Sequence, residues 1–185
     1  MMDTVIYDTK FLQLKSTSSK SGNPWFYAHR PNAKDVVIIL PHTDDEVLFL
    51  IEERPPIQAE GKGKYTIGLA AGLVGDERIG ETLEEAIVSE LLEETGLVAQ
   101  NITIKALKVA SSAGCTSETC TLAIAYIKEK TPAQTPIDDG GIIVNRIWVK
   151  KDNIFNWLKS KEEEGCVLTA QALATLFYLY EDIKL

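Results

Sequence analysis

Residues 75–97 read GDERIGETLEEAIVSELLEETGL, and this stretch carries the strongest local structural signal in the chain. Thr82, followed three residues later by Glu85, forms the capping-box pattern that begins an α-helix. Gly96 stands where a glycine commonly ends one. The stretch therefore predicts a helix over about residues 83–95.

Three glutamates of this helix fall on one side of it. At 100° per residue, Glu90, Glu93 and Glu94 lie within an arc of about 100°. The apolar face that contains Ile87 and Leu91 borders the same arc. The three carboxylates are therefore expected at the rim of the buried face.

These carboxylates have no local basic partner, because no lysine or arginine occurs between Arg78 and Lys105. Like charges at positions i and i+4 repel by roughly 0.2–0.5 kcal/mol, and partial burial adds a desolvation penalty. A hard divalent cation such as Mg²⁺ would offset both costs, since it prefers carboxylate oxygens. A solvated acidic face is the alternative, and E-x-x-E-E taken alone favours it.

The wider stretch resembles the Nudix box. The family pattern is glycine, five residues, glutamate, seven residues, arginine-glutamate-apolar, one residue, glutamate-glutamate, one residue, glycine-apolar. The residues in register are Gly75, Glu81, Glu90, Leu91, Glu93, Glu94, Gly96 and Leu97. The departure is Ser89, where the family has an arginine that braces the box glutamates. A gapped pattern of this length is far more specific than a short glycine motif.

The resemblance implies a hydrolase that cuts a pyrophosphate bridge with Mg²⁺, or Mn²⁺ in its place, as cofactor. Glu90, Glu93 and Glu94 would then be metal ligands, with Glu90 and Glu93 also catalytic. A general base must lie within about 3 Å of the attacking water. Its candidates are Glu93, Glu118 and Asp138; a plain turn is the alternative for D-D-G-G at residues 138–141.

Further similarity points to the ADP-sugar (ADP-ribose) pyrophosphatase branch of the family. Arg54, followed by two prolines, is similar to a substrate-binding segment of that branch. The Ala-Ala-Gly of residues 70–72 is similar to its Pro-Ala-Gly, which implies that the Ala71 carbonyl is a metal ligand. Gly68 stands where the branch has a glutamate. The loop that follows is about three residues longer than usual, so either Gly72 or Gly75 can be the box glycine.

Two other segments carry a looser similarity to the same branch. Residues 113–118 (AGCTSE) are similar to its Pro-Gly-x-Ser-x-Glu segment, which implies a catalytic or substrate-binding role for Glu118. An N-terminal strand contains Trp25. In that branch such aromatics stack on adenine, and the N-terminal sheet exchanges across a dimer. A buried strand aromatic is the equal alternative for Trp25.

Apolar periodicity sets the fold class. Short β-branched runs predict strands at residues 36–40, 47–51, 65–69, 102–110, 121–128 and 142–149, and helical spacing predicts helices at 151–160 and 167–180. Interleaved strands and helices indicate an α/β or α+β class. Strand-like stretches at 4–14 and 24–29 predict an N-terminal hairpin. We therefore expect a Nudix-type α/β/α sandwich with a mixed sheet at 34–185, preceded by small antiparallel strands at 1–33 that act as a dimerisation element.

The amino-acid composition argues against several classes of function. The net charge is −8, from 27 acidic and 19 basic residues, which argues against binding along a nucleic-acid backbone. Three cysteines do not form a disulfide framework, and no apolar run has the length of a signal peptide or a membrane span. We expect a cytoplasmic homodimer that acts on a nucleotide sugar and binds neither nucleic acid nor membrane.

Three functions remain open from the sequence. The first is hydrolysis of ADP-ribose or another ADP-sugar to AMP and a sugar phosphate. The second is a Nudix reaction on another nucleotide, such as a nucleoside triphosphate or a dinucleotide. The third is a catalytically weak nucleotide sensor, which Ser89 and Gly68 favour. Retention of all three box glutamates favours the first two.

Overall fold

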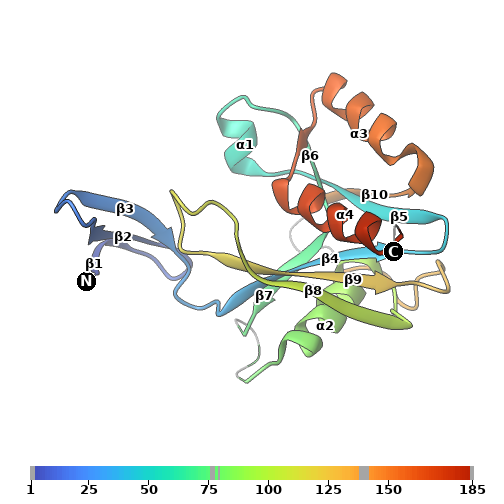
Figure 1. Ribbon diagram of the computed structural model, residues 1–185, viewed down its shortest axis with the longest axis horizontal. Helices are drawn as coiled ribbons and strands as arrows, with labels where there is room; N and C mark the ends of the chain where they lie inside the picture. Colours follow the sequence, from blue (N-terminus) through green and yellow to red (C-terminus); the bar gives the residue numbers. More distant parts are fainter. Residues whose placement is uncertain (1–2, 76–77, 79, 138–141, 184–185) are drawn as a thin grey trace.

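A small and a large β-sheet organise the chain, which was examined as a computed structural model that describes residues 3–75, 78, 80–137 and 142–183. The small sheet contains β1 (Thr4–Asp8), β2 (Gln13–Ser18) and β3 (Pro24–His29), all antiparallel. It stands away from the rest of the molecule and is joined to it through the segment that follows β3 (Figure 1). The predicted N-terminal antiparallel sheet is confirmed.

The large sheet is mixed, as expected. Its strands are β4 (Asp35–His42), β5 (Glu46–Glu52), β6 (Thr66–Gly68), β7 (Ala70–Val74), β8 (Asn101–Ala110), β9 (Thr119–Tyr126), β10 (Ile143–Lys150) and β11 (Val167–Leu168). The main path runs β11-β6-β5-β4-β9-β8, with β10 paired to β5 and β7 paired to β4. The pairs β4–β9 and β6–β11 are parallel, and the others are antiparallel.

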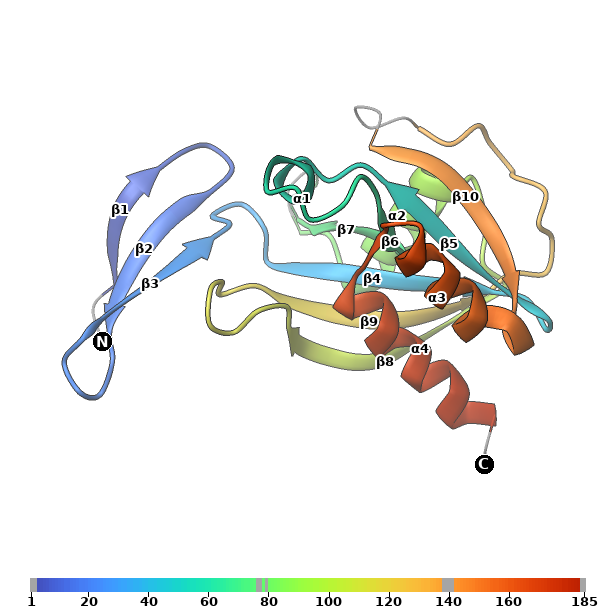
Figure 2. The ribbon, with the colours of Figure 1, turned by 90° about the horizontal axis from the view of Figure 1, so that it is seen from above.

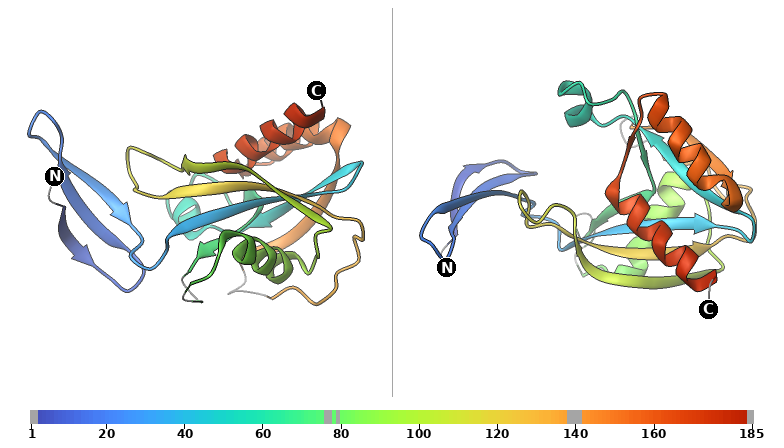
Figure 3. Two further views of the ribbon diagram at one scale, coloured as in Figure 1. Left: turned by 60° about the horizontal axis from the view of Figure 1, so that its bottom comes forward. Right: turned by 45° about the horizontal axis from the view of Figure 1, so that its top comes forward.

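Helices cover both faces of the large sheet. These are the short α1 (Pro55–Ala59), α2 (Leu83–Thr95), α3 (Ile154–Glu163) preceded by the 3₁₀ turn η1 (Lys151–Asn153), and α4 (Ala170–Ile183). Helix α2 lies on one face, and α3 and α4 lie on the other (Figure 2). The expected α/β/α sandwich is therefore confirmed, and the layers are visible edge-on in Figure 3.

Alternation along β5 shows how the two cores form. Leu48 and Leu50 face α2 and pack in the core that contains Ile87 and Leu91, whereas Phe49 packs in the core under α3 and α4. Burial of each large apolar side chain contributes roughly 1.5–3 kcal/mol. A strand that is buried on both faces reads as a continuous apolar run, which is why this strand was predictable.

The first predicted strand is wrong in extent. Residues 4–14 form not one strand but β1, a turn and the start of β2. Thr9 causes the break, because its hydroxyl accepts a hydrogen bond from the Leu12 amide at 2.9 Å and donates one to the Leu12 carbonyl at 2.7 Å. Threonine commonly competes with strand pairing in this way.

Three further boundaries differ from the prediction. Residues 55–59 form α1, since a proline is well tolerated at the first position of a helix. Residues 70–74 pair with β4 as strand β7 and are more than an entry to the helix. The predicted final helix begins later, at Ala170, because Val167–Leu168 pairs with β6. No helix in the described part of the chain is long and apolar enough to cross a membrane.

Candidate active site

Helix α2 has the bounds and caps that the sequence predicts. The Thr82 side chain accepts from the Glu85 amide, and the Glu85 carboxylate accepts from the Thr82 amide at 2.9 Å, which completes the capping box. Gly96 ends the helix with a φ of 73°, a left-handed conformation that glycine adopts without steric cost. The caps fix where the helix starts and therefore which side chains face β7.

Glu90 lies directly against the backbone of β7. A Cβ atom built on Gly72 would come within 1.8 Å of the Glu90 carboxyl carbon, closer than any real contact. A side chain at residue 72 would therefore force this carboxylate to move. The absence of a side chain at Gly72 lets Glu90 pack against β7. Gly75 has a different role: it adopts a φ of 81°, and its amide donates to Glu81 at 3.1 Å.

Glu94 reaches the same strand one residue earlier. Its carboxylate accepts a hydrogen bond from the Ala71 amide at 2.9 Å. Burial raises the pKa of Glu94 to about 8; the Ala71 hydrogen bond acts against this shift, and the charges of Glu52 and Glu90 add to it. Concentrated negative charge in a half-buried setting is the environment that a cation would stabilise.

Glu93 is held by the residue that departs from the box pattern. The Ser89 hydroxyl donates to Glu93 Oε1 at 2.9 Å. The guanidinium of Arg78, which precedes the helix, approaches the same oxygen at 3.9 Å and Glu81 at 3.9 Å. One short hydrogen bond and one long ion pair thus orient Glu93 where the family uses an arginine of the helix.

The donor set fits a hard cation that keeps part of its water shell. Within the described residues, no group of three or more His, Cys, Asp and Glu side chains is arranged to hold a metal ion by itself. Mg²⁺ is commonly held by one or two carboxylates plus waters. The amide and carbonyl of a strand residue point to the same edge, so the Ala71 carbonyl faces the side where Glu94 binds the Ala71 amide. Glu90, Glu94 and this carbonyl would hold such a cation.

Arg54 is anchored by a carboxylate that sequence reasoning missed. Its Nε and Nη2 donate to Glu52 at 3.1 and 2.8 Å, and the Glu52 side chain is only 2% exposed. The alternation of β5 contained a signal, because Glu52 follows Leu48 and Leu50 on the face toward α2. Burial dominates the pKa of Glu94, and the positive charge of Arg54 acts against the resulting rise.

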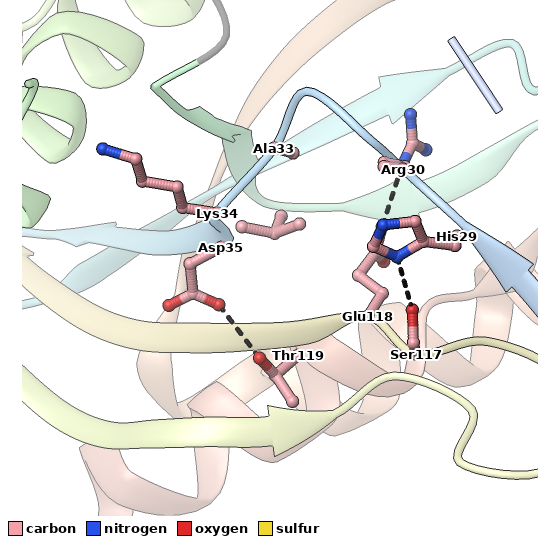
Figure 4. Close-up of a pocket in the computed structure, with 9 residues that line it drawn as sticks. His29, Arg30, Ala33, Lys34, Asp35, Ser117, Glu118 and Thr119 are labelled. Carbon is pink, nitrogen blue, oxygen red and sulfur yellow. Dashed lines mark hydrogen bonds and ion pairs between the residues drawn. The ribbon is translucent and has the colours of Figure 1, made fainter. Parts of the chain in front are cut away.

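Glu118 and Trp25 lie where β3 meets the β8–β9 connection. Glu118 binds Arg30 at 2.9 Å and the Ser111 hydroxyl at 3.1 Å, beside a small polar cavity (Figure 4). The Trp25 indole donates to the Gly114 carbonyl at 3.0 Å, and its ring is 51% exposed. These contacts do not join Glu118 to Glu93. Asp138 lies outside the described residues.

Comparison with known proteins identifies the family of the chain and a protein of similar fold. The NUDIX domain family matches residues 31–168. A crystal structure of an ADP compounds hydrolase superposes with a TM-score of 0.75 at 18% identity, covering 100% of this chain and 92% of that one. At this identity the likeness shows the fold alone. No protein of curated function matches the chain.

The chain has a mixed sheet between helical layers, with an acidic helix laid against a glycine-bearing strand. The chain belongs to the Nudix family and is a pyrophosphohydrolase. Enzymes of this family generally use a divalent metal and act on nucleotide-type small molecules.

Proposed function

We propose that the chain hydrolyses ADP-ribose or another ADP-sugar to AMP and a sugar phosphate, with Mg²⁺ as the cofactor. The observation that carries this proposal is the convergence of Glu90 and Glu94 on the backbone of Ala71 and Gly72. Anchored Arg54 beside that acidic edge adds a fixed cation for a diphosphate. The likeness to an ADP compounds hydrolase supports the choice of an ADP-linked substrate.

The residues divide the chemistry among them. Glu90, Glu94 and the Ala71 carbonyl would hold the cation, and Glu93 would complete this set or orient the attacking water. A bound divalent cation neutralises the diphosphate and makes water a better nucleophile. Water oxygen forms a bond to one phosphorus as the bridging P–O bond breaks. The proton released by water goes to a base, for which Glu93, held by Ser89, is well oriented.

Glu118 is a weaker candidate for that base, because Arg30 and Ser111 already occupy its carboxylate. Its place near Trp25 suits a contact to the substrate better. Trp25 presents an exposed ring on which adenine could stack, since base–aromatic stacking contributes about 1–3 kcal/mol. Asp138 stays a candidate base on sequence grounds.

The small sheet at residues 1–33 is proposed as the dimerisation element. Large apolar side chains between 40% and 71% exposed gather on it: Val5, Ile6, Tyr7, Phe11, Leu12, Leu14, Trp25 and Phe26. So many exposed large apolar side chains on a small sheet are unusual for a monomer. A homodimer in light scattering, lost in a variant without residues 1–33 that keeps its circular-dichroism signal, would support this role.

Turnover is the direct test of the function. Wild type, Glu94→Gln and Glu84→Gln are each assayed with Mg²⁺ against ADP-ribose, ADP-glucose, ATP and a diadenosine polyphosphate. Glu84 is an exposed residue in the first turn of the same helix, so its variant is a matched control. We expect AMP from the ADP-sugars with wild type and Glu84→Gln only.

Other outcomes identify the alternatives. Preference for ATP or the dinucleotide would replace the ADP-sugar with a different Nudix substrate. Absence of turnover on every substrate, with nucleotide binding intact, would contradict the proposed reaction and favour a sensor.

A further inference from the structure

Glu52 is a charged side chain that is buried at the end of the apolar run of β5. It ends β5, its side chain is 2% exposed, and it faces α2 together with Leu48 and Leu50. A buried carboxylate is costly unless a cation and hydrogen bonds offset its lost hydration. Its position therefore calls for a physical reason.

Three hydrogen bonds satisfy this carboxylate. Arg54 donates twice, through Nε and Nη2, and the Thr66 hydroxyl donates to Oε2 at 3.3 Å. Gly68 leaves the necessary space, because a Cβ atom there would lie 2.9 Å from Glu52 Oε2. The β5–β6 register, with Glu52 opposite Thr66 and Leu50 opposite Gly68, brings these groups together.

The pairing leaves one side of the Arg54 guanidinium available. Glu52 takes one N–H from Nε and one from Nη2, and a guanidinium has five N–H donors. Among the described residues the Arg54 side chain makes no other hydrogen bond, and it is 43% exposed. Nη1 and the second Nη2 hydrogen are thus presented outward in a fixed plane.

This plane lies at the end of β5, on the face of the sheet that α2 covers. The C-terminal end of α2 is tied to the same strand, because Arg146 donates to the Glu94 carbonyl and pairs with Leu50, two residues before Glu52. A planar guanidinium with two outward donors matches the geometry of phosphate oxygens. Holding the side chain in one orientation before substrate arrives reduces the entropy that binding would otherwise cost.

We propose that Glu52 is a positioning residue that fixes the Arg54 guanidinium so that its outward N–H groups bind the diphosphate of the substrate. The inference rests on the proposed function, because it assigns the diphosphate of that substrate to Arg54. Gly68 is its structural counterpart: a side chain there would crowd Glu52 away from Arg54.

A substrate-free measurement tests the positioning alone. The Nε–H exchange rate of Arg54 is followed by NMR in wild type, Glu52→Gln and Thr66→Val. We expect exchange with water to be at least about tenfold slower in wild type than in Glu52→Gln, since the bond to a carboxylate is lost. Thr66→Val removes a neutral donor from the same carboxylate but leaves Arg54 paired, so it should resemble wild type. Equal rates in wild type and Glu52→Gln would overturn the proposal.

Kinetics test the consequence for substrate. With ADP-ribose and Mg²⁺, Glu52→Gln should raise KM about tenfold and change kcat less than about threefold. Thr66→Val should leave both near wild type. The effect of Glu52→Gln should disappear in an Arg54→Ala background, where there is no guanidinium to hold. If the rise in KM persists in that background, Glu52 acts without Arg54 and the proposal is wrong.

Binding of ADP distinguishes this failure from a failure of the proposed function. Should wild type not turn over ADP-ribose, ADP is titrated calorimetrically into wild type, Glu52→Gln, Thr66→Val, Arg54→Ala and the double variant of Glu52→Gln with Arg54→Ala. Weaker binding in Glu52→Gln, coupled to Arg54, would retain the positioning role in a protein with another reaction. Equal ADP affinity in wild type and Glu52→Gln would reject the role itself.

Discussion

Glu94 and Glu52 are two acidic side chains on the side of the sheet that α2 covers, and their carboxylates have very different partners. Glu52 is fully buried and receives two hydrogen bonds from Arg54 and one from Thr66. Glu94 receives the Ala71 amide, and among the described residues it makes no ion pair. One carboxylate is neutralised within the fold, whereas burial raises the pKa of the other to about 8, so that its ionised form lacks a partner of opposite charge among the described residues. The difference separates a structural acid from a functional one.

Replacement of Glu94 should have the largest effect on activity. Glu94→Gln removes a proposed cation ligand, and loss even of an outer partner of a metal site costs 10–100-fold, so we expect at least about a hundredfold loss of turnover. The same change removes a poorly compensated buried charge and should stabilise the metal-free fold by roughly 1–2 kcal/mol. Steady-state kinetics and urea unfolding measure the two effects. A destabilised Glu94→Gln would contradict the comparison.

A methyl group at Gly72 should displace the neighbouring carboxylate. The added Cβ of Gly72→Ala would overlap Glu90, which must then move away from β7. Misplacement by about 1 Å can cost about a hundredfold in rate, so we expect a 30- to 100-fold decrease in kcat. Gly114→Ala is the matched control, because a Cβ there meets no atom within 4 Å. Similar kcat values for the two variants would indicate that Glu90 has no fixed place.

Replacement of Arg54 should lower the stability of the fold, because the buried carboxylate of Glu52 depends on its positive charge. Arg54→Ala leaves Glu52 buried without a cation, which should lower the free energy of unfolding by about 2 kcal/mol. The value lies below that of a fully buried pair because Arg54 is half exposed. The double variant with Glu52→Gln should recover part of the loss. Chemical denaturation of both proteins checks this, and an equal loss in the double variant would show that charge is not the cause.

The smallest effect is expected at Ser89. Ser89→Ala removes one hydrogen bond to Glu93, a contact worth about 1 kcal/mol at a half-buried site, so kcat should fall about fivefold. Arg78→Ala should change kcat less, because its ion pair with Glu93 is long and its side chain is 60% exposed. A larger decrease in kcat for Arg78→Ala than for Ser89→Ala would show that Arg78, and not Ser89, is the main residue that orients Glu93.

Much of the fold could be predicted from local pattern. The caps and bounds of α2 followed from Thr82, Glu85 and Gly96, since these residues act through contacts within a few positions. The buried strands β4 and β5 followed from continuous apolar runs. The turn at Thr9 and the short β11 were missed because a side-chain hydrogen bond and a distant strand partner decide them.

In the candidate site, too, features set by local sequence could be predicted and features set by distant contacts could not. Glu90 and Glu94 both lie against β7, whereas Glu93 is held by Ser89, and the roles of all three stay proposals. Glu52 was missed because its significance depends on Arg54, Thr66 and the space at Gly68, which meet only after β5 and β6 pair. Glu118 was a candidate base or substrate contact by resemblance; its carboxylate is bound to Arg30 and Ser111, and its role stays a proposal.

Paramagnetic broadening by Mn²⁺ tests the central claim most directly. Backbone amide signals are followed during a titration of Mn²⁺ into the metal-free wild type, Glu94→Gln and Glu84→Gln proteins. The account predicts that the amides of Ala71, Gly72, Glu90 and Glu94 broaden first in wild type and Glu84→Gln, and persist in Glu94→Gln. Broadening that begins elsewhere, or that is unchanged in Glu94→Gln, would show that the acidic edge of α2 is not the cation site.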